Sequence, residues 1–172
     1  MDISVTTKGV AVVAWAIAAI VGIALLLRPT EEKRVIAAFE HAAEVMSKPE
    51  GESLLVAASR MGSIEDLAAE NVRIAVPEQR VNAVFERREA ARRFLAVRAS
   101  CATLSVRFEG INVESIEDGV ARATADLLVS GAGAGAFLDG RDTREVSAEL
   151  VKGADDGKWR FSSVTINEIV ER

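Results

Sequence analysis

Four long segments in the second half of the chain alternate apolar and polar residues, and this alternation constrains the fold more than any other feature of the 172-residue sequence. The segments are residues 102–110, 120–130, 143–151 and 158–170. Successive side chains of a strand point to opposite faces, so each segment is predicted to be a β-strand with one buried face. The alternation changes phase at Gly110 and near Ser162-Ser163, as a β-bulge would cause. Asp156-Gly157 is typical of a hairpin turn, and together the segments predict an antiparallel sheet.

The region before these strands is predicted to be mainly helical. Residues 31–48 carry apolar side chains at the i, i+3, i+4, i+7 spacing of an amphipathic helix. Residues 52–61 predict a second, short helix that is broken at Gly62-Ser63, and residues 84–98 predict a third. Between them "NVRIAVP", residues 71–77, predicts a short strand that its proline ends.

This order of elements resembles the nuclear transport factor 2-like (SnoaL-like) superfamily over residues 30–172. The resemblance is carried by "LAAENVRIAVP", by the third helix and by the final hairpin, "GKWRFSSVTINEI". It implies an α+β domain of the cystatin/nuclear transport factor 2-like kind, in which a cone-shaped, curved antiparallel sheet packs on three helices. The superfamily includes ketosteroid isomerases, dehydratases, epoxide hydrolases, polyketide cyclases and non-enzymatic binding or assembly domains, so the fold alone fixes no function.

The inside of the cone is expected to be apolar. Enzymes of the superfamily need a carboxylate or histidine there, usually with a tyrosine or aspartate that holds an oxyanion. The expected lining holds no titratable side chain, and the chain has no tyrosine. No catalytic residue, metal or cofactor is therefore assigned, and the sequence favours a non-catalytic domain over an enzyme. The candidate lining of a pocket for a small apolar ligand is Phe39, Leu104, Val106, Phe108, Ala121, Ala123, Ala125, Val146, Ala148, Trp159 and Phe161.

Other residues that could suggest chemistry are predicted to lie outside the cone. His41, the only histidine, falls away from the apolar stripe of its helix, and Arg122 and Asp126 face away from the apolar side of their strand. "GAGAGA", residues 131–136, joins two antiparallel strands, whereas a phosphate-binding loop leads from a strand into a helix. Cys101 is the only cysteine, so neither an intrachain disulfide nor a Cys-rich zinc site is possible.

The N-terminal region holds an uncharged run at residues 10–27. As a helix, its 18 residues reach about 27 Å, close to the 30 Å or so of a bilayer's hydrocarbon core. A signal peptide has a shorter apolar region followed by small residues, whereas this run ends in "LLLRPT". The sequence therefore favours a transmembrane anchor at 9–28, between a short tail at 1–8 and the domain at 29–172, over a cleaved signal or a buried core helix.

The orientation of such an anchor is left open by the charges around it. Lys8 precedes the run, and Arg28, Lys33 and Arg34 follow it. Basic residues are enriched on the cytoplasmic side of a membrane span, so this count taken alone places the domain in the cytoplasm. Long domains cross largely regardless of charge, and a short tail with one lysine also fits an uncleaved signal anchor. We therefore favour a single-pass protein of the bacterial inner membrane with its domain outside the cytoplasm.

Possible partners are constrained weakly. Ala14, Ala18 and Gly22 share one helical face, which either packs membrane helices closely or arises by chance in an alanine-rich run. The net charge of −5 argues against nucleic acid as a partner.

The leading hypothesis is a membrane-anchored assembly domain that forms a homo-oligomer or binds a membrane protein, similar in layout to the bitopic subunit of type IV secretion systems. The alternatives are an apolar-ligand binding domain and an isomerase, dehydratase or hydrolase.

Overall fold

The computed structural model describes residues 30–133 and 140–168. The predicted anchor at 9–28 lies outside these ranges, and so do Ala14, Ala18 and Gly22. Within the described ranges no helix combines the length and apolar character that crossing a bilayer requires. The anchor and its orientation therefore stay predictions from the sequence.

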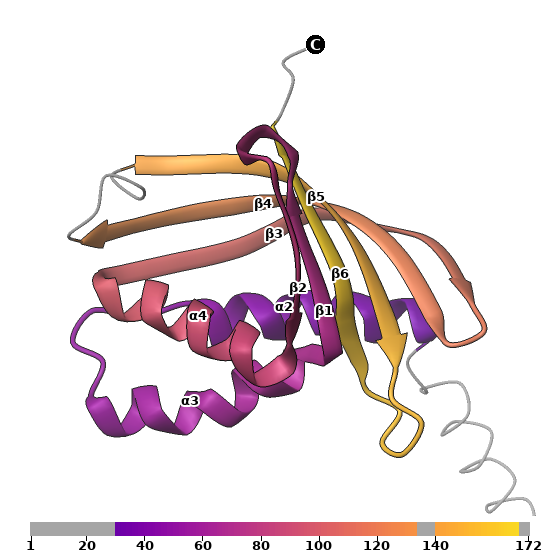
Figure 1. The fold of residues 1–172 in the computed structure, drawn as a ribbon, viewed down its shortest axis with the longest axis horizontal. Coiled ribbons are helices and arrows are strands. Elements are labelled where there is room, and N and C mark those ends of the chain that lie inside the picture. The colour runs from indigo at the N-terminus through magenta and orange to yellow at the C-terminus, as the bar shows by residue number, and fades with distance from the viewer. Residues whose placement is uncertain (1–29, 134–139, 169–172) are drawn as a thin grey trace, which may run out of the picture. The chain divides into compact units, whose positions relative to one another are not determined.

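Within the described residues, three helices lie under the concave side of a curved, six-stranded sheet (Figure 1). The helices are α2 (Glu31–Met46), α3 (Leu54–Leu67) and α4 (Arg87–Ser100). The strands are β1 (Ala68–Val76), β2 (Val81–Glu86), β3 (Cys101–Glu117), β4 (Val120–Gly133), β5 (Gly140–Lys152) and β6 (Trp159–Glu168). Their order in the sheet is β2-β1-β6-β5-β4-β3. The α+β architecture with three helices agrees with the expectation from the sequence.

The sheet is mixed, so the expectation of a purely antiparallel sheet is wrong. β1 runs parallel to β6, and all other neighbouring strands are antiparallel. A parallel pair needs a long connection, and here the whole chain between β1 and β6 supplies it. Because β1 enters the sheet directly from the end of α3, its direction is set by the helix layer and not by a hairpin with β6.

Two local predictions are also corrected. Residues 81–86 form strand β2, which pairs with β1 from Val76↔Val81 onward, and helix α4 starts only at Arg87. A 3-10 turn over Pro77–Gln79, closed by Arg80 at φ 54°, reverses the chain and brings β2 onto β1. The pairing of these two strands overrides the helical pattern of residues 84–86. Helix α3 also continues through Gly62, because Ile64 beyond it is buried against the other helices.

The two phase changes read from the sequence are β-bulges. Gly110 has φ 60°, and the pairing of β3 with β4 shifts register there. On β6, Ser162 is the extra residue where the partner on β5 changes from Glu149 to Leu150. Bulges bend the strand that carries them and increase its twist. These two bends contribute to the curvature that makes the sheet concave toward the helices.

The centre of the core is Phe39 on α2, which is completely buried. It belongs to the same cluster as Ala121, Ala123 and Ala125, the small residues on the inner face of β4. Small side chains let a helix approach a sheet closely. The space opposite these alanines is therefore occupied by α2.

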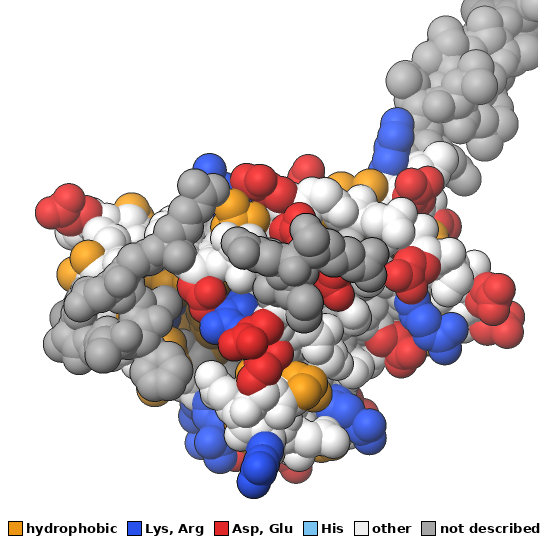
Figure 2. Space-filling view, turned by 90° about the horizontal axis from the view of Figure 1, so that it is seen from above, with side chains coloured by type: hydrophobic (Ala, Val, Ile, Leu, Met, Phe, Trp, Pro, Cys, Tyr) orange, Lys and Arg blue, Asp and Glu red, His pale blue; other side chains and the backbone are white. Residues whose placement is uncertain are grey.

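The outer face of the sheet is polar. Arg122 and Glu149 form an ion pair of 3.5 Å there, and Asp126 lies opposite Glu145 across β4 and β5. Figure 2 shows charged side chains spread over this side of the molecule and hydrophobic ones only scattered, apart from what the grey atoms hide. The alternation along the strands thus separates a charged outer face from an apolar inner face.

Candidate functional site

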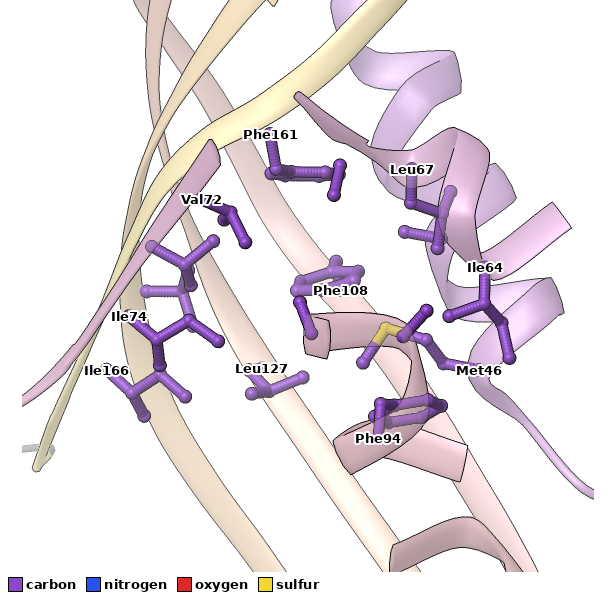
Figure 3. A pocket seen from close by; sticks show the side chains of 16 residues that line it. Met46, Ile64, Leu67, Val72, Ile74, Phe94, Phe108, Leu127, Phe161 and Ile166 are labelled. Carbon is purple, nitrogen blue, oxygen red and sulfur yellow. The ribbon is translucent and has the colours of Figure 1, made fainter. Parts of the chain in front are cut away.

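An apolar cavity of about 180 Å³ lies between the concave face of the sheet and the helices (Figure 3). All sixteen residues that line it have apolar side chains. They are Ala42, Met46, Ile64, Leu67, Ala68, Val72, Ile74, Ala90, Ala91, Phe94, Phe108, Leu127, Val146, Phe161, Val164 and Ile166. Polar atoms are almost absent from its surface, so a molecule inside it would contact carbon and sulfur nearly everywhere.

The cavity has a strand side and a helix side. Figure 3 shows Ile74 and Ile166 on strands, facing Met46 and Phe94 across the open space. Val146, deeper in the sheet, is fully buried, whereas Ile74 and Ile166 are half-buried. The cavity is therefore closed at Val146 and more accessible where Ile74 and Ile166 line it.

The size of the cavity limits what it can hold. An engineered protein cavity of about 150 Å³, lined by Leu, Ile and Phe, stays dry and binds benzene or xenon. The present cavity, at about 180 Å³, is of the same order and has the same chemistry. It suits a single aromatic ring or a short branched hydrocarbon, and its surface offers such a molecule about 25 cal/mol for each Å² of apolar area removed from water.

Three of the eleven candidate lining residues, Phe108, Val146 and Phe161, line this cavity. The other eight lie in packed clusters of the core. Those in the main cluster are Phe39, Ala121, Ala123, Ala125, Ala148 and Trp159, and those in a second cluster with Cys101 are Leu104 and Val106. The eight packed residues thus lie outside the cavity, which is lined by one residue each from β3, β4 and β5 and by several from β1 and β6.

The walls that sequence reasoning missed come from α3, α4 and β1. Ile64 and Leu67 lie one helical turn apart at the end of α3, and Ala90 and Phe94 lie one turn apart on α4. This i, i+3 or i, i+4 spacing was a usable signal, because apolar residues at that spacing form one helix face. The sequence does not tell which strands such a face will oppose.

Charged side chains begin directly beyond the apolar walls. Arg144 on β5 is paired across the sheet with Leu127 on β4 and with Glu168 on β6. Its guanidinium lies 3.0 Å from a carboxylate oxygen of Asp142, 3.5 Å from one of Glu168 and 3.8 Å from one of Glu78. We call these four side chains the rim cluster. Asp142, through its hydrogen bonds, and then the other two carboxylates raise the pKa of Arg144 above its usual value.

A separate ionic cluster is buried between the helices. The carboxylate of Glu52 accepts two hydrogen bonds from Arg98, of 2.6 and 2.7 Å, and lies 3.1 Å from Nε of Arg60. The side chains of Glu52 and Arg98 are 1% and 3% exposed. The hydrogen bonds with Arg98 lower the pKa of Glu52. None of these three side chains lines the cavity, and the pair joins the segment just before α3 to the end of α4.

The remaining candidates from the sequence lie outside the cavity. His41 is exposed on α2, with Glu44 3.9 Å away, and Arg122 and Asp126 are exposed on the outer face. Cys101 is buried and points its thiol at the Val97 carbonyl, 3.4 Å away. Over residues 30–133 and 140–168, no three His, Cys, Asp or Glu side chains are placed to hold a metal ion.

Solved structures share this fold. The protein Kfla4162 from Kribbella flavida is 14% identical over 82% of this chain and 92% of its own, with a TM-score of 0.64. An NTF2-like protein from Cytophaga hutchinsonii is 11% identical over 82% and 100%, with a TM-score of 0.59. ActVI-ORFA from Streptomyces coelicolor is 15% identical over 81% and 98%, with a TM-score of 0.58.

These similarities show a nuclear transport factor 2-like fold. At such identities they establish the fold alone and carry no activity with them. The sequence matches no protein-family model and no curated protein sequence. What the domain does must therefore be argued from its own cavity.

Proposed function

We propose that the domain binds a small apolar molecule inside the cone. The observation that carries the proposal is the cavity of about 180 Å³ whose sixteen lining residues are all apolar. Ligand pockets are concave and mostly apolar, and they occur preferentially where a fold leaves an opening between its layers. The cavity has these properties, and it lies beside the packed core cluster that contains Phe39.

The composition of the walls supports binding over turnover. Proton-transfer chemistry needs an acid or base within about 3 Å of the reacting atom. The nearest charged groups on the inner face belong to the rim cluster, at the accessible end, where Arg144 already contacts three carboxylates. A reacting atom held among Val146, Phe108 and Phe161 would have only apolar neighbours.

The methionines give a direct test. The chain has three, of which Met46 lines the cavity and Met61 is exposed on α3. With methyl-labelled methionine in the full chain, held in nanodiscs of phosphatidylcholine, added toluene is expected to shift the methyl resonance of Met46 and to leave that of Met61 in place. The ring current of a bound aromatic molecule acts only over a few ångströms, so the shift reports occupancy of the cavity itself.

A matched pair of substitutions separates the cavity from general partitioning. Ala90→Leu adds bulk to the cavity wall on α4, whereas Ala96→Leu makes the same change on the exposed side of that helix. We expect Ala90→Leu to weaken toluene binding about 10-fold or more and Ala96→Leu to leave it unchanged. A Met46 resonance that does not respond to toluene, or that responds equally in both variants, would contradict the proposal.

A second candidate function, assembly with another copy or with a membrane protein, is favoured by exposed apolar residues on the helices. Leu55 is 84% exposed, and Val56 and Met61 on α3 and Val97 on α4 are also exposed. Native mass spectrometry of the full chain released from membranes tests it. A defined oligomer or a stoichiometric protein partner supports assembly, and a bare monomer argues against it.

Anchoring through residues 10–27 is proposed on the strength of the sequence. The uncharged length of 18 residues and the large residues at its end support a retained span. The chain is expected to stay with membranes after an alkaline wash, and protease added to spheroplasts is expected to digest the domain. Release by the wash would contradict the anchor, and protection from protease would contradict the orientation.

A further inference from the structure

The rim cluster stands at the edge of the cavity and on the same face of the sheet. Residues paired directly across an antiparallel sheet point to the same side, as do residues two apart on one strand. Arg144 is paired with Leu127 and is two residues from Val146, and both of these line the cavity. Glu168 is two residues from Ile166, which also lines it. Arg144 and Glu168 therefore form the row of the inner face that follows the apolar walls.

The charges of the rim cluster do not balance. It contains three carboxylates, from Glu78, Asp142 and Glu168, and one guanidinium, from Arg144. Nε of Arg144 is shared between both oxygens of Asp142, at 3.0 and 3.1 Å, and Nη1 faces Glu78 and Glu168. The guanidinium is thus already occupied by protein carboxylates, and the four described side chains of the rim cluster carry two negative charges in excess.

Two basic residues on the helix side, Arg87 and Arg93, have partners of their own. Arg93 on α4 is paired with Glu89 at 2.8 Å and lies over the ring of Phe85, 4.8 Å from its centroid. Arg87 donates a hydrogen bond to the Ala69 carbonyl at 3.5 Å. These two cations thus already have partners on α4, β2 and the start of β1.

Building on the proposed binding function, we infer that the cavity discriminates its ligands by charge: it takes apolar molecules whose polar end is neutral or cationic and rejects those that end in a carboxylate. The cavity is the binding site, and the rim cluster decides which polar group a bound molecule can carry at the accessible end. A carboxylate there meets the excess negative charge of the rim cluster, and like charges repel one another. An ammonium group is attracted by the same charges.

Three probes with the same body test the inference. Phenylbutanol, phenylbutylamine and phenylbutyrate each place a phenyl ring in the cavity and carry a polar end that is neutral, cationic or anionic. Their affinities are read from the Met46 methyl resonance of the full chain at pH 7 in nanodiscs of phosphatidylcholine. We expect the amine to bind at least about 10-fold more tightly than the acid, with the alcohol between them.

A matched pair of double variants assigns the preference to the rim cluster. Asp142→Asn with Glu168→Gln removes the two excess charges at the rim. Asp126→Asn with Glu145→Gln removes two charges from neighbouring positions of β4 and β5 on the outer face. The first variant is expected to reduce the preference for the amine to about threefold or less, and the second to leave it unchanged.

The outcomes separate this inference from the proposed function. If phenylbutanol leaves the Met46 resonance unmoved, the cavity does not bind such molecules. The proposed binding function itself is then wrong, and the charge discrimination that rests on it falls with it. If phenylbutanol binds but the amine and the acid bind equally, or the acid binds better, the charge discrimination is wrong and the binding function stands. An amine preference that is the same in both double variants also overturns it, because the preference then comes from overall charge.

Discussion

Phe39 on α2 meets Phe161 on β6 edge to face, with ring centroids 5.0 Å apart and ring planes at 85°. Phe108 on β3 makes a contact of the same kind with Phe39, at 5.2 Å and 81°. Phe108 and Phe161 line the cavity, whereas Phe39 does not. Phe39 therefore holds two cavity walls in place from the packed side of the core, and the shape of the binding site depends on a residue that no ligand touches.

Removal of the Phe39 ring is expected to be severely destabilising. Phe39→Ala should lower the free energy of unfolding by about 3–5 kcal/mol, because the residue is fully buried and its neighbours can close the space only in part. Denaturant unfolding of the full chain measures this change. Phe85→Ala, at a half-buried position on β2, is the control and should cost clearly less. Equal losses in the two variants would show that Phe39 is not the centre of the core.

The buried pair of Glu52 and Arg98 gives a second prediction. Glu52→Gln leaves the Arg98 guanidinium buried without its counter-charge, and loss of one partner of a buried ion pair typically costs about 3–5 kcal/mol. Glu89→Gln breaks the exposed pair with Arg93 and should cost about 0.5 kcal/mol or less. Denaturant midpoints of the two variants test the contrast. A Glu52→Gln protein as stable as Glu89→Gln would mean that water reaches the buried pair.

Asp156 gives a prediction about pH. Its carboxylate accepts hydrogen bonds from Arg160, at 2.6 and 3.1 Å, and from the backbone N–H of Lys158, at 3.1 Å. These bonds, those of Arg160 first, lower its pKa from the usual 3.8 to about 2. Because the folded state has the lower pKa, the carboxylate stabilises the fold above pH 3.8, and this contribution disappears as the pH falls toward 2.

Two measurements check this behaviour. The pKa of Asp156 can be read from the NMR titration of its carboxyl carbon. Asp156→Asn should be less stable than the parent at pH 6, and the difference should shrink as the pH falls toward 2. A difference that stays constant with pH would show that the hydrogen bonds do not depend on the charge.

Substitution by alanine is expected to change the stability of the domain in opposite directions at two glycines. Gly62 lies within α3, and a Cβ added there would have no neighbour within 4 Å, so Gly62→Ala should stabilise the domain by about 0.5–1 kcal/mol. At Gly131 on β4 an added Cβ would lie 2.7 Å from the Thr103 carbonyl oxygen, so Gly131→Ala should destabilise it. Thermal unfolding compares the two variants, and the same sign for both would contradict the prediction.

Much of the sheet could be predicted, because alternation is a local property of a strand. The bulges at Gly110 and Ser162 were visible as changes of phase. Strand β2 was not, since its last residues, Val84 to Glu86, continue smoothly into the helical pattern of α4. The pairing of β2 with β1 decides that boundary, and pairing is a tertiary property that a local pattern does not contain.

The candidate site was harder to predict than the fold. The sequence indicated which side chains face inward, but not which part of the cone α2 fills with Phe39 and which part it leaves open. Arg144 is a different case. It is in phase with Val146 along β5, so the same alternation that assigned Val146 to the inner face also places Arg144 there. A charged residue at the end of an apolar strand face was a usable signal for the edge of the site.

Strand β6 lies between β1 and β5, so the last of the six described strands along the chain is the one that closes the sheet. Until residue 168 has left the ribosome, the hairpin of β1 and β2 has no partner and β5 has an open edge. The earlier parts of the chain can form their helices and the β3–β4–β5 meander, but not one continuous sheet. A chain that stops before Trp159 exposes two unpaired strand edges and the apolar face beneath them, so translation that ends early yields a product suited to aggregation and to proteolysis.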